Sequence, residues 1–231
     1  MDKNLLPIPM SRTERIWGIR YLLFQLVFLS TLITLILYAV YPGFSNALLN
    51  FLYFSINFLA VTWIFRRYLL ASLSHLRRDL MQILLCAATG FLLYWILNIG
   101  LSAMIRLAFP AHFNVNDAVI GQASQRHFWL MAVGSVLLAP MTEELLYRGL
   151  LFGSLHGRSR ALAYGVSILV FCAIHVSGYA QIFPFHLLAV SFIQYVPGGL
   201  ILAWAYERSG NIFCPIAIHM AINIVGTLSM R

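Results

Sequence analysis

The chain has 231 residues, of which 61% are hydrophobic and only 10% are charged. Soluble globular proteins carry about 25% charged residues, so this composition excludes a soluble protein and indicates one integral to a membrane. The net charge of +8 therefore does not indicate nucleic-acid binding, because Lys and Arg in a membrane protein report topology and contact with anionic lipid. The three cysteines all have apolar neighbours; we expect buried thiols and no disulfide framework.

In chain order, the polar and basic residues 1–20 are expected to form a cytosolic N-terminal segment, and residues 21–231 a single integral membrane domain. The first apolar run is longer than a signal-peptide core and is expected to be retained. Apolar runs of near-spanning length predict an all-α, polytopic bundle of about seven transmembrane helices. The expected spans are 21–41, 47–65, 82–105, 128–155, 161–177, 186–206 and 212–230.

Three segments between or within these runs have other patterns. Residues 68–80 are basic with interspersed leucines and are expected to lie along the membrane interface. Residues 106–127 are predicted to be a polar loop, and Pro197-Gly198-Gly199 is predicted to interrupt the sixth span.

Basic residues predict the orientation of the chain. With seven spans and a cytosolic N-terminus, eleven of the fifteen Lys and Arg residues fall on the cytosolic side. Arg106, Arg126 and Arg231 fall outside, and Arg148 lies within a span. This asymmetry predicts a multi-pass protein of the cell membrane whose C-terminus lies on the outer side.

The fourth span contains three charged residues, Glu143, Glu144 and Arg148. A single charge at the bilayer centre costs at least ~2.5–3.5 kcal/mol, so such residues face a protein interior or a wet cavity. Glu144 and Arg148 stand at i, i+4 and are expected to pair. Glu143 is rotated about 100° from Glu144 and is free to point elsewhere. A structural ion pair and a functional site are both consistent with this pattern, and we favour the functional site.

Two further spans carry polar residues at similar expected depths: His175 on the fifth, and His219 with Asn223 at i, i+4 on the seventh. Each alone is consistent with hydrogen-bonded helix packing. Together with the carboxylates they suggest activation of a water molecule, with a buried carboxylate as general base. Two His and one Glu also match a hydrolytic zinc set, although HExxH and a serine elbow are absent.

The pattern Glu143-Glu144-x3-Arg148, Phe171-x3-His175 and His219-x3-Asn223, in this order on three apolar segments, resembles the CPBP intramembrane protease family. That family includes type II CAAX prenyl endopeptidases and the bacterial bacteriocin-processing and immunity (Abi) proteins. The resemblance covers residues 128–230, whereas residues 1–127 match only as generic spans.

The resemblance implies an intramembrane endopeptidase that hydrolyses membrane-associated peptides or proteins, such as bacteriocin precursors. It implies Glu143 as the base with His175 beside it, His219 and Asn223 as oxyanion or water ligands, and Glu144 with Arg148 as the supporting pair. Zinc as a cofactor is left open. The alternatives are a noncatalytic immunity or partner-binding protein and a proton-coupled transporter. The bilayer is the other expected partner, nucleic acid is not expected, and the oligomeric state is not predicted.

Overall fold

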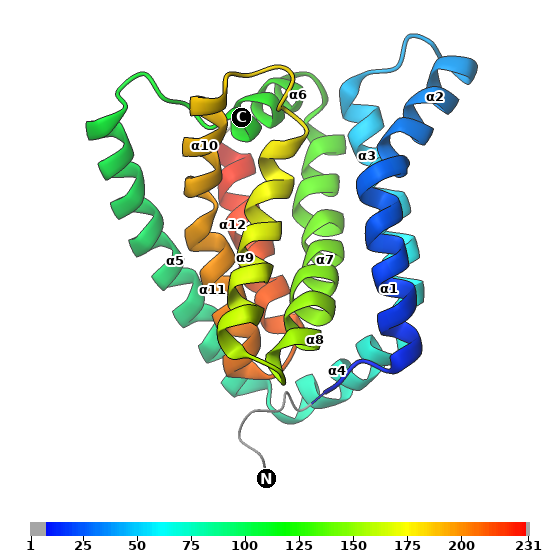
Figure 1. Cartoon of the computed structure of the whole chain (residues 1–231), viewed down its shortest axis with the longest axis vertical. Helices are drawn as coiled ribbons and strands as arrows, with labels where there is room; N and C mark the ends of the chain where they lie inside the picture. Colours follow the sequence, from blue (N-terminus) through cyan, green and yellow to red (C-terminus); the bar gives the residue numbers. More distant parts are fainter. Residues whose placement is uncertain (1–7, 230–231) are drawn as a thin grey trace.

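The computed structural model describes residues 8–229, and within this range the chain forms helices and no strands (Figure 1). Three π-helical segments, Gln25–Leu29, Val133–Leu138 and Leu145–Phe152, continue helices without a break. The α-helices are α1 (Arg12–Phe24), α2 (Ser30–Val40), α3 (Asn46–Ile64), α4 (Arg66–Arg78), α5 (Leu80–Ala108), α6 (Val115–Ala132), α7 (Ala139–Glu144), α8 (Gly153–His156), α9 (Arg160–Ser177), α10 (Phe185–Gln194), α11 (Val196–Ser209) and α12 (Phe213–Ser229).

The prediction of an all-α membrane bundle is confirmed. Six helical stretches within residues 8–229 are long and apolar enough to cross a membrane, and α12 is a shorter apolar helix. Together they agree with about seven spans. The longest stretch, Val115–His156, contains α6, α7 and α8 and carries the charged residues of the predicted fourth span.

The first helix begins earlier than the predicted span. Ser11 caps α1 and forms a capping box with Glu14, so the helix runs without a break from Arg12 to Val40. Part of the segment predicted to be a cytosolic tail is therefore helical; residues 1–7 lie outside the described range. Glu14 also accepts a hydrogen bond from the backbone nitrogen of Tyr68 at 2.9 Å, which joins α1 to α4.

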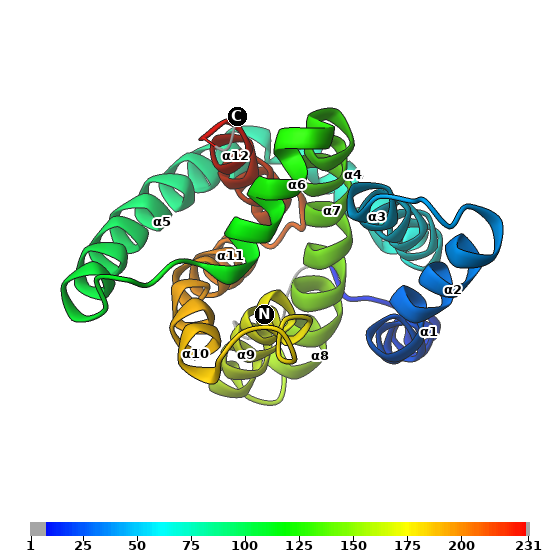
Figure 2. The ribbon, with the colours of Figure 1, turned by 90° about the horizontal axis from the view of Figure 1, so that it is seen from above.

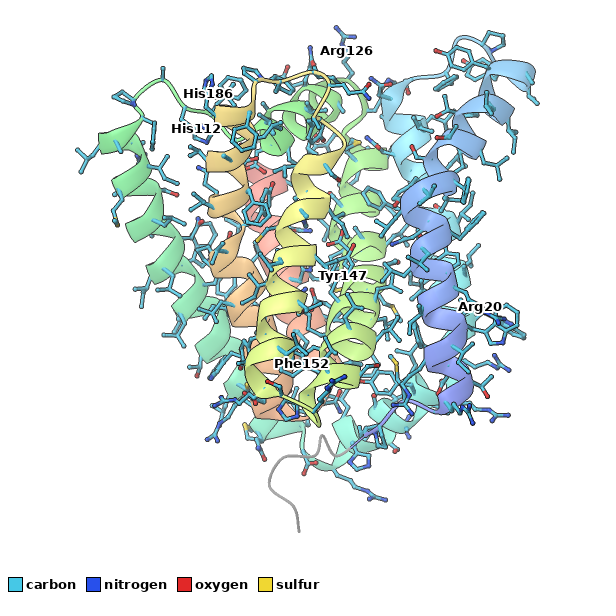
Figure 3. All side chains as sticks on the ribbon, viewed as in Figure 1. Arg20, His112, Arg126, Tyr147, Phe152 and His186 are labelled. Atoms are coloured by element: carbon cyan, nitrogen blue, oxygen red, sulfur yellow. The ribbon has the colours of Figure 1, made fainter. Side chains whose placement is uncertain are left out.

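Helix α4 lies across one end of the bundle (Figure 1). We call this the basic end, because several arginines gather there: those of α4, Arg158 in the turn between α8 and α9, Arg160 at the start of α9, and Arg208 in the last turn of α11. Figure 3 shows Arg126 and His112 at the opposite end, with Tyr147 between the two ends. Which end faces the cytosol stays a prediction.

The predicted polar loop 106–127 is wrong for its second half, which is the first part of α6. Asn114 caps this helix by accepting hydrogen bonds from the backbone nitrogens of Asn116 and Asp117 at 3.1 and 3.2 Å. His127 has non-helical angles (φ −139°, ψ 52°), so the helix kinks there, next to the start of the predicted span. Figure 2 shows α6 across the end opposite the basic end, between α5 and α7.

The sixth span is interrupted, but at Tyr195 and not at the predicted Pro197-Gly198-Gly199, which is helical within α11. Helix α10 ends at Gln194, and α11 begins at Val196 with Pro197 in its first turn. A Cβ atom on Gly199 would lie 3.2 Å from Ile168 Cγ2. The glycine therefore permits the close approach of α11 to α9 that positions the site described next.

Candidate active site

A buried ion pair forms the floor of the site. Arg148 Nη1 lies 2.9 Å from Glu144 Oε1, and both side chains are fully buried, as their i, i+4 spacing predicted. Arg148 Nη2 also donates to the carbonyl of Gly199 at 3.2 Å, and the guanidinium lies 4.5 Å from the ring centroid of Phe171. Glu144 is the last residue of α7, and Arg148 lies within the π-helical segment Leu145–Phe152 that follows, a backbone form that is frequent at functional sites.

His219 of α12 joins this pair, a contact that the spacing of the sequence did not predict. Its Nδ1 lies 2.8 Å from Glu144 Oε1, the same oxygen that accepts from Arg148. The same oxygen forms the ion pair with Arg148, and an ion-paired carboxylate oxygen only accepts hydrogen bonds, so His219 Nδ1 is the donor. The contact therefore fixes the orientation of the imidazole ring.

Glu143 faces a different partner from its neighbour Glu144. Its Oε2 lies 3.9 Å from His175 Nε2, and the two side chains are 16% and 15% exposed. His175 Nδ1 lies 2.7 Å from the carbonyl oxygen of Phe171, to which it donates. In a neutral ring Nε2 is then an acceptor, so an unprotonated nitrogen faces a carboxylate oxygen.

Four of the six predicted site residues line one cavity of about 460 Å³. Glu143, His175, His219 and Asn223 all line it, whereas Glu144 and Arg148 lie behind its wall. Asn223 Nδ2 donates one hydrogen to the carbonyl of Ser135 at 2.8 Å. The amide nitrogen carries two hydrogens, so Asn223 is held by one while it borders the cavity.

Sequence reasoning missed Tyr195, which lies at the break between α10 and α11. Its ring stacks on His175, with centroids 4.2 Å apart and an interplanar angle of 30°. Its hydroxyl donates to Asp117 Oδ1 at 3.1 Å and accepts from Asn116 Nδ2 at 2.9 Å. The stack covers one face of the imidazole, and the ring of Phe171 packs beside it, with its centroid 4.5 Å from that of His175 and 6.3 Å from that of Tyr195.

Sequence reasoning also missed Asn116 and Asp117, because it assigned residues 106–127 to a polar loop and did not predict the start of α6. Both line the cavity from the first turn of α6. A signal was present in the sequence, because Asn114 followed three residues later by an acidic residue is a helix-start pattern. A second cavity of about 200 Å³ borders the first and shares five lining residues with it: Asp117, His175, Tyr195, His219 and Asn223.

The donor set does not form a metal site in this arrangement. No group of three or more His, Cys, Asp or Glu side chains within residues 8–229 is placed to hold a metal ion. Both Nδ1 atoms of the two histidines are directed at protein acceptors. This arrangement does not fit zinc, and whether the protein uses zinc, which the sequence left open, is a matter for experiment.

The fold and the site define a multi-pass helical membrane protein with a buried site of carboxylates, imidazoles and an amide. Residues 125–225 match the family model described as type II CAAX prenyl endopeptidase Rce1-like. The predicted resemblance is confirmed over this region, which contains all six predicted site residues. At the level of the family, this supports an intramembrane protease.

Two curated relatives come from Lactococcus lactis and one from Bacillus subtilis. UPF0177 protein YbdJ is 28% identical over a 149-residue alignment that covers 59% of each chain. UPF0177 protein YxdF is 25% identical over 95 residues, 41% of this chain and 47% of that protein. The B. subtilis protein named "Putative membrane peptidase YdiL" is 28% identical over 95 residues, 41% of this chain and 34% of that protein.

The matched regions thus span between about a third and three fifths of these relatives. No solved structure matches the chain.

Proposed function

We propose that this protein is an intramembrane endopeptidase that hydrolyses peptide bonds of membrane-associated peptides or proteins with a water activated by Glu143. The observation that carries the proposal is the Glu143–His175 pair, 3.9 Å apart on the wall of a cavity that also presents His219 and Asn223. The match of residues 125–225 to a CAAX endopeptidase family supports the same chemistry.

The separation of the pair suits a shared water. A distance of 3.9 Å is too long for a direct hydrogen bond, and polar groups at such distances are often bridged by water. Glu143 Oε2 and the neutral His175 Nε2 are both acceptors, so one water can donate a hydrogen to each. Its lone pairs then point away from both residues, toward a substrate carbonyl.

In the first step, the water oxygen bonds to the carbonyl carbon and Glu143 takes the proton. The carbonyl oxygen becomes an oxyanion, toward which Asn223 can direct its second amide hydrogen, with His219 beside it. In the second step, the C–N bond breaks and Glu143 returns the proton to the leaving nitrogen. Water is thus consumed, and a carboxylic acid and an amine are formed.

Glu144 and Arg148 act in this proposal by positioning. Glu144 Oε1 holds His219 through Nδ1, and Arg148 ties Glu144 to the backbone of α11 through Gly199. An unpaired buried carboxylate would be costly and would not hold one orientation. The pair therefore keeps the His219 ring fixed while bonds change at the neighbouring water.

The first test compares the wild-type protein with Glu143→Gln on peptides extracted from host membranes, with products read by mass spectrometry. Glutamine keeps the shape and hydrogen bonding of glutamate but is not a base. We expect the variant to fold and insert normally and to turn over at least about a hundredfold more slowly. Near-normal cleavage by well-folded Glu143→Gln would show that Glu143 is not the base.

A second experiment, in which metal ions are removed with a chelator, tests whether cleavage requires zinc. If a metal bound by two histidines and a glutamate supplied the water, chelation would abolish cleavage and zinc would restore it. The proposal expects unchanged cleavage after chelation. If the wild-type protein cleaves no membrane peptide although it binds some, the noncatalytic immunity or partner-binding function becomes the better assignment.

A further inference from the structure

The cavity carries a second carboxylate, which the proposed chemistry does not use. Asp117, on the first turn of α6, lines both the 460 Å³ cavity and the 200 Å³ cavity that borders it. It is an exposed residue, in contrast to the fully buried Glu144. Asp117 therefore faces the space that a substrate would fill without being part of the supporting ion pair.

The walls of the two cavities have an unbalanced charge. Among the described residues that line them, Asp117 and Glu143 are the carboxylates, and no Lys or Arg is present. Arg148, the nearest guanidinium along the fourth span, lies behind the wall and is already paired with Glu144. The remaining polar lining consists of histidines, amides and hydroxyls, so the space has a negative side without a compensating cation.

Asp117 is also held in place. Tyr195 donates to its Oδ1 at 3.1 Å, and Tyr195 stacks on His175. The backbone nitrogen of Asp117 donates to the Asn114 side chain at 3.2 Å. The carboxylate thus stands at a fixed position relative to the proposed water site, as a group that selects substrates requires.

We propose that Asp117 is a specificity-determining residue that binds a primary ammonium group of the substrate next to the scissile bond. The ammonium can belong to a lysine side chain or to a free N-terminus. A substrate carboxylate at this position would meet two like charges, so the C-terminal carboxylate of a CAAX-type substrate is disfavoured there. This inference rests on the proposed function, because it concerns the same cavity.

The role of Asp117 can be tested by measuring peptide binding in a variant that does not turn the peptides over. The Glu143→Gln variant in detergent is titrated with fluorescent apolar 20-residue peptides that carry one Lys, Gln or Glu, scanned over successive positions. Each peptide is made with a free and with an acetylated N-terminus, which separates the two sources of the ammonium. A charge-assisted hydrogen bond predicts that the best Lys or free-amine peptide binds about tenfold or more tightly than its Gln or acetylated counterpart.

Three variants in the Glu143→Gln background sharpen the result. Asp117→Asn keeps the shape and should reduce the preference for the ammonium to about twofold or less. Asp117→Lys should shift the preference to the Glu peptide. Asp79→Asn is the matched control, because it removes an exposed carboxylate at the basic end, away from both cavities; it should leave the preference unchanged.

Equal binding of the Lys, Gln and Glu peptides overturns the inference, as does the absence of binding by every ammonium peptide. A preference that survives Asp117→Asn in a variant with unchanged melting also overturns it. These outcomes are separate from failure of the proposed function, which would appear as the absence of cleavage by the wild-type protein of the peptides that Glu143→Gln binds.

Discussion

At the scale of single residues, the site depends on one buried oxygen. Glu144 Oε1 accepts from Arg148 at 2.9 Å and from His219 at 2.8 Å, so one carboxylate links the fourth span to α12. Arg148 adds the link to α11 through the Gly199 carbonyl. Loss of either partner would leave a buried charge uncompensated. The free-energy cost of that unpaired charge is larger than the net stabilisation that the intact pair provides.

Arg148→Ala is therefore expected to lower the free energy of unfolding by about 3–5 kcal/mol and to reduce cleavage as well. Thermal unfolding in detergent measures the first effect. Arg208→Ala is the control, since Arg208 is an exposed arginine at the end of α11, and it should melt as the wild type does. Unchanged melting of Arg148→Ala with lost activity would instead place Arg148 in the chemistry.

Two substitutions at Tyr195 distinguish the effect of its ring stacking from the effect of its hydrogen bonds. Tyr195→Phe keeps the ring on His175 but loses the hydroxyl that contacts Asp117 and Asn116. We expect it to turn over within a few-fold of wild type, and Tyr195→Ala to fall by about tenfold, since an aromatic pair is worth about 0.5–1.5 kcal/mol. Measured kcat values decide this; equal effects of the two substitutions would make the hydroxyl, and not the stack, the positioning contact.

At the scale of elements, the approach of α11 to α9 decides whether the site is assembled. The Gly199 carbonyl can receive Arg148 because α11 lies close to α9, and a side chain on Gly199 would meet both Cγ2 and Cα of Ile168, at 3.2 and 3.4 Å. Tyr195, at the break between α10 and α11, lies one turn earlier, and its ring stacks on His175. Packing between helices distant in sequence thus sets contacts within the site.

Gly199→Val is expected to destabilise the protein by about 1–3 kcal/mol through overpacking and to weaken the Arg148 contact. Gly165→Val on α9 is a matched control: it introduces the same side chain where no atom would lie within 4 Å of a new Cβ. Melting temperatures of the two variants in the same detergent check the prediction. If both melt alike, close packing at Gly199 is not what holds the helices together.

At the scale of the whole molecule, the site lies away from the basic end. The first turn of α6, the end of α9 and the C-terminal half of α12 all contribute to the cavity wall, and α6 crosses the end opposite α4 (Figures 1 and 2). If the basic end faces the cytosol, as the positive-inside rule predicts, substrates reach the cavity from the outer half of the membrane.

Cysteine labelling in intact cells tests this orientation. Gly157→Cys lies in the turn between α8 and α9, Ala111→Cys lies just before α6, and both positions are exposed. The three native cysteines are buried, which limits background. An impermeant maleimide should label Ala111→Cys and not Gly157→Cys until the cells are opened. The reverse pattern would invert the orientation, and labelling of both positions would contradict the number of spans.

The sequence alone predicted the all-α membrane architecture, because helices that cross a bilayer must be long, apolar runs. It also predicted the Glu144–Arg148 pair, since i, i+4 neighbours meet within one helix whatever surrounds them. The three motifs identified the family resemblance and all six candidate residues. Those residues stand out because a polar group within an apolar span is rare and costly.

Only the tertiary structure decided which polar groups meet across helices. The contact of His219 with Glu144, the stack of Tyr195 on His175 and the entry of Asp117 into the cavity join residues far apart in the chain. Their distances depend on helix rotation and close approach, which no local spacing encodes. Asp117 could not be predicted for a further reason. Polar residues outside the spans have the composition of an ordinary loop, and only the capped helix α6 places this one at the site.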